Sequence, residues 1–294
     1  MQDFDTFTAH RVPANGIEVA CWTKGDGPPL LLLHGYPQTH VMWHKIAGTL
    51  SETFTVIAPD LRGYGDSDKP DSGPDVGHAP YSKREMAQDQ IDVMAHFGFE
   101  AFDVCGHDRG GRVAHRMAID HPKRVRRLAV LDIVPTYKIY METDRGIAED
   151  YYHWFFLIQP ADYPERMIGN DAAYYLQKKM GKYSFGEDVF TETAKAEYLR
   201  CFDNPAAIHA SCEDYRAAAT IDLEHDKADL DLKLTQPLLA LWGEKGAMAR
   251  NYDVLSAWRE RAQHVSGHSL PCGHYLAEEK PAETLAALKE FFRV

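Results

Sequence analysis

The sequence predicts an α/β protein with a mostly parallel sheet, helices on both faces of that sheet and one helical insertion. Short apolar runs alternate with longer amphipathic stretches, which is the pattern of buried parallel strands joined by helices. The alternation breaks once, between Pro135 and Pro237, in a segment rich in Tyr, Trp, Met and charge that contains no clear buried strand. We therefore expect a core domain of residues 1–134 and 236–294 and a helical lid of residues 135–235.

The individual elements follow from these patterns in order along the chain. The expected strands are short apolar runs bounded by turn residues, at 17–22, 30–33, 55–58, 102–105, 128–132, 238–242 and 264–270. The expected core helices repeat apolar residues at a helical period, at 41–51, 82–97, 109–121, 253–261 and 282–292. Residues 69–80 are rich in Pro, Gly and Asp, so we expect an irregular loop there.

Charge and composition restrict the class of protein. The chain has 294 residues, of which 45% are hydrophobic, so it can bury a large core. Its formal net charge of -12 argues against nucleic acid or an anionic membrane as a partner. No apolar run approaches the length of a membrane span, and the acidic start MQDFDTFTAH is not expected to be a signal peptide.

Cysteines and metal-ligand motifs add little to the function. Five cysteines are an odd number and too few for a disulfide scaffold, so we expect reduced thiols in a cytoplasmic protein. The histidines are scattered, and the sequence has no HExxH motif and no pair of CxxC motifs. We therefore expect neither a metal nor a cofactor.

The most informative stretch is an expected strand that runs into a turn with glycines on both sides of Asp108. The pattern Gly106-x-Asp-x-Gly110 is a nucleophile elbow with Asp in place of Ser, which projects the side chain over the carboxyl end of the sheet. A carboxylate is ionised at neutral pH and is favoured at a helix N-terminus, so Asp108 needs no base to act as a nucleophile. The alternative is that Asp108 is only an N-cap beside turn glycines.

Other motifs favour catalysis over the capping role. The turn 34–37, HGYP, follows a strand, and such a turn supplies a backbone N–H to an oxyanion hole; we expect the N–H groups of Tyr36 and Arg109 there. His274 lies in the loop between the last strand and the last helix. The sequence thus resembles the α/β-hydrolase fold over nearly the whole chain, with nucleophile, acid and histidine in the order of that fold. Residues 60–67, DLRGYGDS, also match and are interpreted as a structural turn.

Two residues compete for the role of the acid that orients His274. Asp132 ends the strand that follows the elbow helix, and Glu244 follows the next strand. Both positions are used in this fold. We favour Asp132, because it lies at a more clearly defined strand end, whereas Glu244 lies beside Lys245. Asp132 would hold His274 in the correct tautomer and stabilise its charged form.

Two arginines beside the nucleophile indicate the substrate class. Arg109 and Arg112 lie in the first turn of a helix, where positive charge is unfavourable. Arg112 is four residues after Asp108, so it returns to the nucleophile's face; the simplest alternative is an ion pair between these two. A pair of arginines suits a small carboxylate held by bidentate hydrogen bonds better than a neutral substrate.

With these residues in view, the sequence resembles the haloacetate (fluoroacetate) dehalogenases. The matching motifs are HGYPQ at 34–38, GHDRGGR at 106–112, LDIVPTY at 131–137, YHWFFLIQP at 152–160, CEDYRA at 212–217, IDLEHD at 221–226 and GHY at 273–275. The resemblance implies Asp108 as nucleophile, Arg109 and Arg112 as carboxylate binders, Asp132 with His274 as the hydrolytic pair, and a homodimer. It also implies a halide pocket in the lid, formed by His153, Trp154 and Tyr215.

The chain departs from the family at two positions. Tyr36 stands where members often have Phe, and Tyr183 stands where Trp is expected, so the pocket size is expected to differ. The three implied halide ligands offer an imidazole N–H, an indole N–H and a phenol O–H, which are neutral donors suited to a leaving fluoride. Read alone, an aromatic pair such as His153 and Trp154 more often belongs to a core.

The resemblance therefore implies hydrolysis of a haloacetate, such as fluoroacetate or chloroacetate, to glycolate and halide through an ester on Asp108. Two alternatives stay open. An epoxide hydrolase also uses an elbow Asp and needs two lid tyrosines to protonate the epoxide oxygen, which this tyrosine-rich lid could supply. The paired arginines argue against it, because they offer nothing to a neutral epoxide. A non-catalytic receptor on the same fold is disfavoured by the complete set Asp108, Asp132 and His274.

Overall fold

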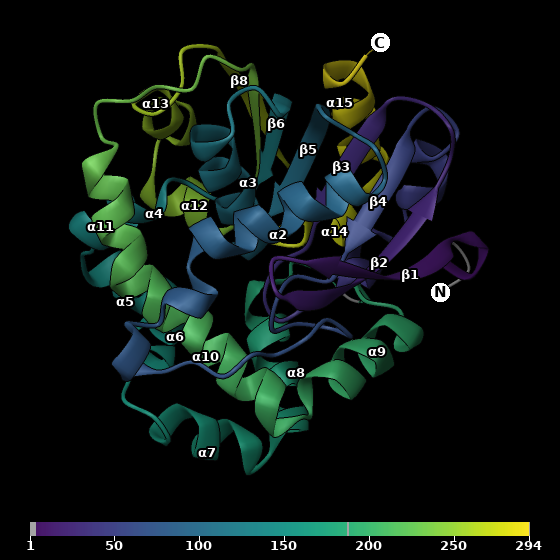
Figure 1. Cartoon of the computed structure of the whole chain (residues 1–294). Coiled ribbons are helices and arrows are strands. Elements are labelled where there is room, and N and C mark those ends of the chain that lie inside the picture. Colours follow the sequence, from purple (N-terminus) through teal and green to yellow (C-terminus); the bar gives the residue numbers. More distant parts are fainter. Residues whose placement is uncertain (1–3, 187, 294) are drawn as a thin grey trace.

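The computed structural model describes residues 4–186 and 188–293, and within them an eight-stranded sheet forms the centre of the molecule (Figure 1). The strands are β1 (Thr8–Ala14), β2 (Ile17–Lys24), β3 (Pro29–Leu33), β4 (Thr55–Pro59), β5 (Phe102–His107), β6 (Val125–Leu131), β7 (Leu238–Gly243) and β8 (Val265–Leu270). Their order is β1-β2-β4-β3-β5-β6-β7-β8. β2 is antiparallel to β1 and β4, and the remaining pairs are parallel. The predicted mostly parallel sheet is confirmed.

Helices cover both faces of the sheet. The core helices are α1 (Ala47–Leu50), α2 (Lys83–His96), α3 (Arg109–Asp120), α12 (Ala247–Asn251), α13 (Val254–Arg259), α14 (Leu276–Glu279) and α15 (Pro281–Phe291). Along β3, Leu31 and Leu33 join the apolar cluster that contains α2 and α3, whereas Leu30 and Leu32 join the cluster that contains α1 and α15. Alternate residues of a strand point to opposite faces, so a continuous apolar run is what a doubly covered strand requires.

The chain between β6 and β7 is helical where it has regular structure. Its helices are α4 (Thr136–Met141), α5 (Arg145–Asp150), α6 (Tyr152–Leu157), α7 (Tyr163–Gly169), α8 (Ala172–Tyr183), α9 (Glu192–Phe202), α10 (Pro205–Ala219) and α11 (Ile221–Ala228). In Figure 1 most of them form a layer below the sheet. We call this segment the lid; the domain boundaries proposed at 135 and 235 stay a prediction.

Two elements differ from the sequence-based expectation. β1 was not predicted, because its sequence TAHRVPA has little apolar content and contains Pro13. Proline is tolerated there because β1 is an edge strand that pairs with β2 alone. The helix expected at 41–51 is instead a 3-10 turn at His40–Trp43 followed by the short α1. His44 N–H bonds Val41 O, three residues back, and the Nδ1 of His44 bonds the same oxygen, so the first turn closes early.

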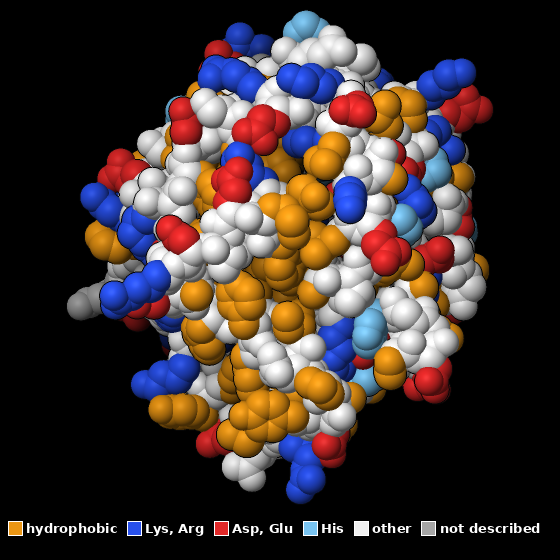
Figure 2. All heavy atoms as spheres, turned by 90° about the vertical axis from the view of Figure 1, so that its left-hand side faces the viewer, with side chains coloured by type: hydrophobic (Ala, Val, Ile, Leu, Met, Phe, Trp, Pro, Cys, Tyr) orange, Lys and Arg blue, Asp and Glu red, His pale blue; other side chains and the backbone are white. Residues whose placement is uncertain are grey.

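Apolar side chains are gathered in a band on one face of the molecule (Figure 2). The exposed large apolar residues include Met141 at the end of α4, Tyr163 and Met167 on α7, and Leu230 after α11. The assembly state stays a prediction. In the described part of the chain, none of the helices combines the length and apolar character needed to cross a membrane.

Candidate active site

The elbow between β5 and α3 places Asp108 at the carboxyl edge of the sheet. Asp108 has φ 46° and ψ -113°, a conformation that is costly for a residue with a side chain. The neighbouring glycines make this turn possible. A Cβ on Gly106 would lie 2.4 Å from the carbonyl oxygen of Gly110, and a Cβ on Gly110 would lie 2.4 Å from that of His34. The turn therefore requires glycine on both sides of the buried carboxylate.

The turn after β3 brings a backbone donor to this carboxylate. The N–H of Tyr36 donates to Asp108 Oδ1 at 3.0 Å. Gly35 permits the approach, because a Cβ there would lie 2.6 Å from the Cβ of Asp108. Arg109 begins α3, where the N–H has no intrahelical partner. One expected oxyanion donor, the N–H of Tyr36, thus lies in the turn that contacts the Asp108 carboxylate. The other, the N–H of Arg109, directly follows Asp108 in the chain.

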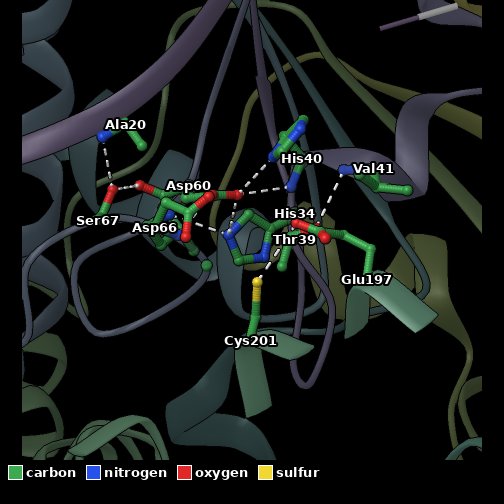
Figure 3. A network of polar contacts seen from close by, with 12 residues as sticks. Ala20, His34, Thr39, His40, Val41, Asp60, Asp66, Ser67, Glu197 and Cys201 are labelled. Carbon is green, nitrogen blue, oxygen red and sulfur yellow. Dashed lines mark hydrogen bonds and ion pairs between the residues drawn. The ribbon is translucent and has the colours of Figure 1, made fainter. Parts of the chain in front are cut away.

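A buried polar network supports the Tyr36 turn from below (Figure 3). Asp60 Oδ1 accepts hydrogen bonds from the backbone N–H and the Nδ1 of His40, at 2.8 and 2.9 Å. His34 Nε2 accepts the N–H of Leu61 at 2.9 Å. Burial alone would raise the pKa of Asp60, but the His40 ring and the hydrogen bonds hold it at about 2. The segment 60–67 thus has the structural role expected of it.

His274 and Asp132 form a hydrogen-bonded pair at the ends of β8 and β6. His274 Nδ1 lies 2.6 Å from Asp132 Oδ2, and Asp132 Oδ1 accepts the N–H of Gly243 at 3.0 Å. With Nδ1 committed, Nε2 is the atom of His274 left for proton transfer. Glu244 is instead 43% exposed and pairs with Lys245 at 3.3 Å. The geometry therefore selects Asp132 over Glu244.

Arg109 and Arg112 are both buried, but they are held differently. Arg109 forms a forked ion pair with Asp214 of α10, with Nε and Nη2 at 2.8 and 2.6 Å from its carboxylate oxygens. Arg112 Nη1 donates to Val134 O at 3.1 Å and to Thr136 Oγ1 at 2.9 Å. In the described residues Arg112 forms no ion pair, so the alternative of a pair with Asp108 is wrong. Arg109 Nη1 and the Nε and Nη2 of Arg112 have no partner.

The three lid residues implied by the resemblance lie together. His153 and Trp154 are on α6, and their rings lie 5.7 and 6.1 Å from the ring of Tyr215 on α10. The indole nitrogen of Trp154 and the hydroxyl of Tyr215 are buried without a hydrogen-bond partner. These two groups therefore have a free donor hydrogen.

The hydrogen bonding of His153 differs from the expectation. Its Nδ1 lies 3.0 Å from the hydroxyl of Tyr183, and that hydroxyl donates to the carbonyl of Asp150. The hydroxyl has one hydrogen, so the Nδ1–H of His153 must be the donor to Tyr183. Burial keeps the pKa of His153 well below its ordinary value, so the ring is neutral and Nε2 is an acceptor. This network argues against His153 as a donor to a halide.

The unpaired donors of the core and the lid meet in one place. The guanidinium carbon of Arg109 lies 4.2 Å from the ring centre of Tyr215, and that of Arg112 lies 4.6 Å from the ring centre of Trp154. Buried polar groups are normally paired. Five unpaired donor atoms on four adjacent side chains therefore indicate a site built for an acceptor-rich ligand.

Comparison with known proteins agrees with this geometry. Residues 28–281 match the alpha/beta hydrolase fold family. The chain belongs to the α/β-hydrolase family. It is 45% identical to a fluoroacetate dehalogenase from Burkholderia sp, over 98% of this chain and 94% of that protein. It is 36% identical to a soluble epoxide hydrolase from Corynebacterium sp. (strain C12), over 97% of each chain. The crystal structure of an alpha/beta hydrolase from Nostoc sp PCC 7120 superposes with a TM-score of 0.97, at 58% identity and 99% coverage of both chains.

The electrostatics of this α/β-hydrolase site keep Asp108 ionised. Burial alone would raise the pKa of Asp108, but the electrostatic influence of His274, His107, Arg112 and Arg109 lowers it to about 2. Asp108 is therefore a carboxylate throughout the physiological pH range. Among the described residues, no group of three or more His, Cys, Asp or Glu side chains is arranged to hold a metal ion.

Two residues of the site were missed by the sequence analysis. Asp214 precedes Tyr215 within the CEDYRA motif, and nothing in the sequence links it to Arg109, 105 positions earlier. Lys179 of α8 is buried beside Tyr36 and Tyr183. Its signal in the sequence is weak, because a lysine on a lid helix is ordinarily solvated.

Proposed function

We propose that this α/β-hydrolase removes the halogen of a haloacetate, fluoroacetate or chloroacetate, by hydrolysis to glycolate and halide. The observation that carries the proposal is the set of unpaired buried donors on Arg109, Arg112, Trp154 and Tyr215. Two are cationic and suit a carboxylate, and two are neutral and suit a halogen that gains negative charge as it leaves. The 45% identity to a fluoroacetate dehalogenase supports the same conclusion.

The first step is displacement at the α-carbon. The substrate carboxylate binds Arg112 through Nε and Nη2 and Arg109 through Nη1, the atoms that have no other partner. Asp108 Oδ1 already accepts the Tyr36 N–H, so Oδ2 is the oxygen free to attack the α-carbon. The carbon–halogen bond breaks as the carbon–oxygen bond forms. The bonding electrons leave with the halide, which accepts hydrogen bonds from Trp154 and Tyr215.

The second step hydrolyses the resulting glycolyl ester of Asp108. His274 Nε2 takes a proton from water, and the Nδ1–H bond to Asp132 stabilises the charged ring. The hydroxide attacks the ester carbonyl carbon, and the oxyanion develops on Oδ1. The N–H of Tyr36 is already directed at that atom, and the N–H of Arg109 is the second donor. The intermediate collapses as the charged His274 returns its proton to the leaving glycolate oxygen, and Asp108 loses its remaining hydroxyl proton to solvent. Glycolate then leaves and the carboxylate of Asp108 is restored.

Epoxide hydrolysis is the second candidate function, and the 36% identity to a soluble epoxide hydrolase favours it. That reaction needs a phenol to protonate the epoxide oxygen, and Tyr215 has a free hydroxyl. Tyr183 is less suited, because its hydroxyl is committed to Asp150. Two buried arginines gain nothing from a neutral epoxide, so we rank dehalogenation first.

One set of assays tests the proposal directly. Halide release from fluoroacetate and chloroacetate is measured beside diol formation from a small neutral epoxide, with the same enzyme preparation. We expect turnover of the haloacetates and little or none of the epoxide. Diol formation without halide release would overturn the proposal in favour of epoxide hydrolysis. Asp108→Ala is the control for a contaminating activity, because it removes the nucleophile.

Because Asp108 and His274 act in different steps, the proposed mechanism predicts that the ester intermediate can be trapped. His274→Asn should still release one halide per active site, because the displacement needs only the ionised Asp108. It should not turn over, because ester hydrolysis needs the base. Intact-protein mass spectrometry should then show a glycolyl adduct that peptide mapping assigns to Asp108. An unmodified His274→Asn protein after incubation with chloroacetate would contradict the two-step mechanism.

A further inference from the structure

Lys179 is a buried cation without a counter-ion. Its side chain lies on the inner face of α8, and the residue is 3% exposed. In the part of the chain that the structure describes, its ammonium forms neither a hydrogen bond nor an ion pair. It contacts two aromatic faces instead, with Nζ 4.0 Å from the ring centre of Tyr183 and 5.5 Å from that of Tyr36. A cation in this position lacks the partner that buried charges normally have.

The two rings that Lys179 contacts also contact residues of the candidate site. The ring of Tyr36 lies 5.3 Å from that of Tyr215 and stacks 6.4 Å from that of His153. The hydroxyl of Tyr183 bonds the Nδ1 of His153. The Lys179 ammonium therefore lies beside the aromatic cluster that contains Tyr215. The two arginines contact a different pair of rings, since Arg109 lies over Tyr215 and Arg112 lies over Trp154.

The charge of Lys179 depends on what occupies the site. Burial lowers its pKa to about 7, the negative charge of Asp108 raises it in part, and Lys182 on the same helix lowers it. His153 faces it as a neutral ring. In the resting enzyme Asp108 is thus the anion that favours the protonated form of Lys179. An additional anion near the ammonium would favour it further.

The first step of the proposed reaction removes the negative charge of Asp108 that favours protonated Lys179. When Asp108 becomes a neutral ester, its negative charge passes to the halide ion. We propose that the ammonium of Lys179 binds this halide after the carbon–halogen bond has broken, so that a cation holds the product where neutral donors assisted its departure. The ligand is a small inorganic anion. This inference rests on the proposed function for its place in the reaction, but the binding itself is measurable without turnover.

The test uses Asp108→Asn, which removes the negative charge at position 108 as esterification does. Halide affinity is measured by calorimetric titration with sodium bromide, and sodium isethionate serves as the control for ionic strength. We expect Asp108→Asn to bind bromide more tightly than the wild type, because the competing carboxylate charge is gone. Adding Lys179→Met should weaken that affinity by roughly tenfold or more, since a charge-assisted contact is lost.

Lys182→Met in the same Asp108→Asn background is the matched control. Lys182 lies one turn further along α8 and contacts the same Tyr183 ring at 5.5 Å, but it is exposed and donates to Glu149 O. We expect its removal to leave bromide affinity unchanged within about twofold. Lys179→Arg, which keeps the charge, should retain most of the affinity and shows that loss of charge rather than misfolding explains the Met variant.

Equal bromide affinity with and without Lys179→Met would overturn the inference. Weaker glycolate binding with unchanged bromide binding would also overturn it and would assign Lys179 to the substrate carboxylate. These outcomes are separable from a failure of the proposed function. If the enzyme released no halide from any haloacetate but still bound bromide through Lys179, the anion site would stand and the reaction would not.

Discussion

Arg109 shows how one side chain can serve both the fold and the site. The sequence led us to expect that the two arginines together hold a small carboxylate through bidentate hydrogen bonds. In the structure Asp214 already occupies Nε and Nη2 of Arg109, which leaves Nη1 for a ligand. Arg112 has the two neighbouring nitrogens Nε and Nη2 free. In the complex that we propose, the bidentate contact therefore falls to Arg112, and Arg109 contributes a single directed donor.

The lid donors predict different sensitivities for different leaving groups. Trp154→Phe and Tyr215→Phe each remove a donor directed at the departing halogen while keeping an aromatic ring in place. Each change should slow fluoroacetate turnover by about 2–4 kcal/mol of barrier, by analogy with a lost oxyanion donor. Chloroacetate should suffer clearly less, because chloride is a better leaving group and depends less on hydrogen bonds. The measurement is kcat/KM for both substrates with each variant.

An equal loss of activity on both substrates would argue against halide binding by Trp154 and Tyr215. If each variant slowed fluoroacetate and chloroacetate by the same factor, Trp154 and Tyr215 would be packing residues. His153→Phe is an informative comparison. The ring of His153 donates to Tyr183 rather than into the pocket, so its replacement should affect the two substrates more evenly.

The residues of the core were more predictable than those of the lid. Asp108 and His274 were expected because their positions depend on local turns at strand ends, and a turn leaves a pattern of glycines in the sequence. The pairing of Arg109 with Asp214 depends on how the lid packs on the core, and no local pattern encodes it. The tautomer of His153 is set by Tyr183, which is 30 positions away. Such long-range contacts become visible only in the folded chain.

At the scale of elements, α10 connects the lid to the substrate site of the core. Asp214 accepts bonds from Arg109 of α3 and Tyr64 and pairs with Lys83 at the start of α2. The next residue on α10 is Tyr215, whose hydroxyl is free. The same helix thus orients Arg109, the proposed carboxylate binder, and carries Tyr215, a proposed halide donor. The way α10 packs on the core therefore sets the positions of both groups.

Asp214→Asn should therefore damage binding as well as stability. Removing one charge from a buried ion pair costs about 3–5 kcal/mol of folding free energy. Arg109 also loses the partner that directs it, so KM for chloroacetate should rise by roughly tenfold. We expect a smaller change in kcat, since Asp108 and its elbow are untouched. Steady-state kinetics and thermal unfolding measure the two effects.

Asp222→Asn is the matched control for this prediction. Asp222 is buried, caps α2 by accepting the N–H of Lys83 at 2.8 Å, and makes no contact with Arg109. It should lower the melting temperature without raising KM. If Asp214→Asn lowered stability and left KM unchanged, Asp214 would be a structural residue rather than a positioning residue for Arg109.

A second link between core and lid is a buried carboxyl group, Glu278 of α14. It bonds Gln38, two residues after Tyr36, and the hydroxyl of Tyr198 on α9 at 3.0 Å. Burial raises its pKa from 4.5 to about 8. The folded state therefore holds this proton more tightly than the unfolded chain, so stability is lost as pH rises from about 4.5 to about 8.

Glu278→Gln should remove this pH dependence. The amide keeps a neutral group of the same shape but has no proton to lose. The wild type should lose several degrees more of melting temperature than the variant between about pH 6 and about pH 9. Thermal unfolding at a series of pH values checks this. Parallel stability curves for the two proteins would mean that Glu278 is ionised in the folded state at neutral pH.

At the scale of the whole molecule, an anionic substrate approaches a protein of formal net charge -12. The long-range field of the chain opposes this approach. A cavity of about 130 Å³ beside His274 is lined by three cationic side chains, Lys182, Lys245 and Arg250. Two of these three charges are paired locally with carboxylates. Arg250 pairs with Asp150 at 2.9 Å, and Lys245 pairs with Glu244. The overall negative field should therefore dominate beyond a few ångströms.

This balance predicts the sign of a salt effect. Raising ionic strength from about 10 to about 200 mM with sodium isethionate shortens the Debye length from about 30 Å to under 10 Å and screens the repulsion. We expect kcat/KM for chloroacetate to rise by about two- to threefold, because encounter becomes easier. The value of kcat should stay constant, since the bound substrate lies among buried groups that salt screens little. A non-halide salt is essential, because chloride would compete for the halide site. A fall of kcat/KM with salt would show instead that the cavity lined by Lys182, Lys245 and Arg250 attracts the substrate. If Lys245→Gln then removed this salt dependence, the charge of Lys245 would be part of the attracting field.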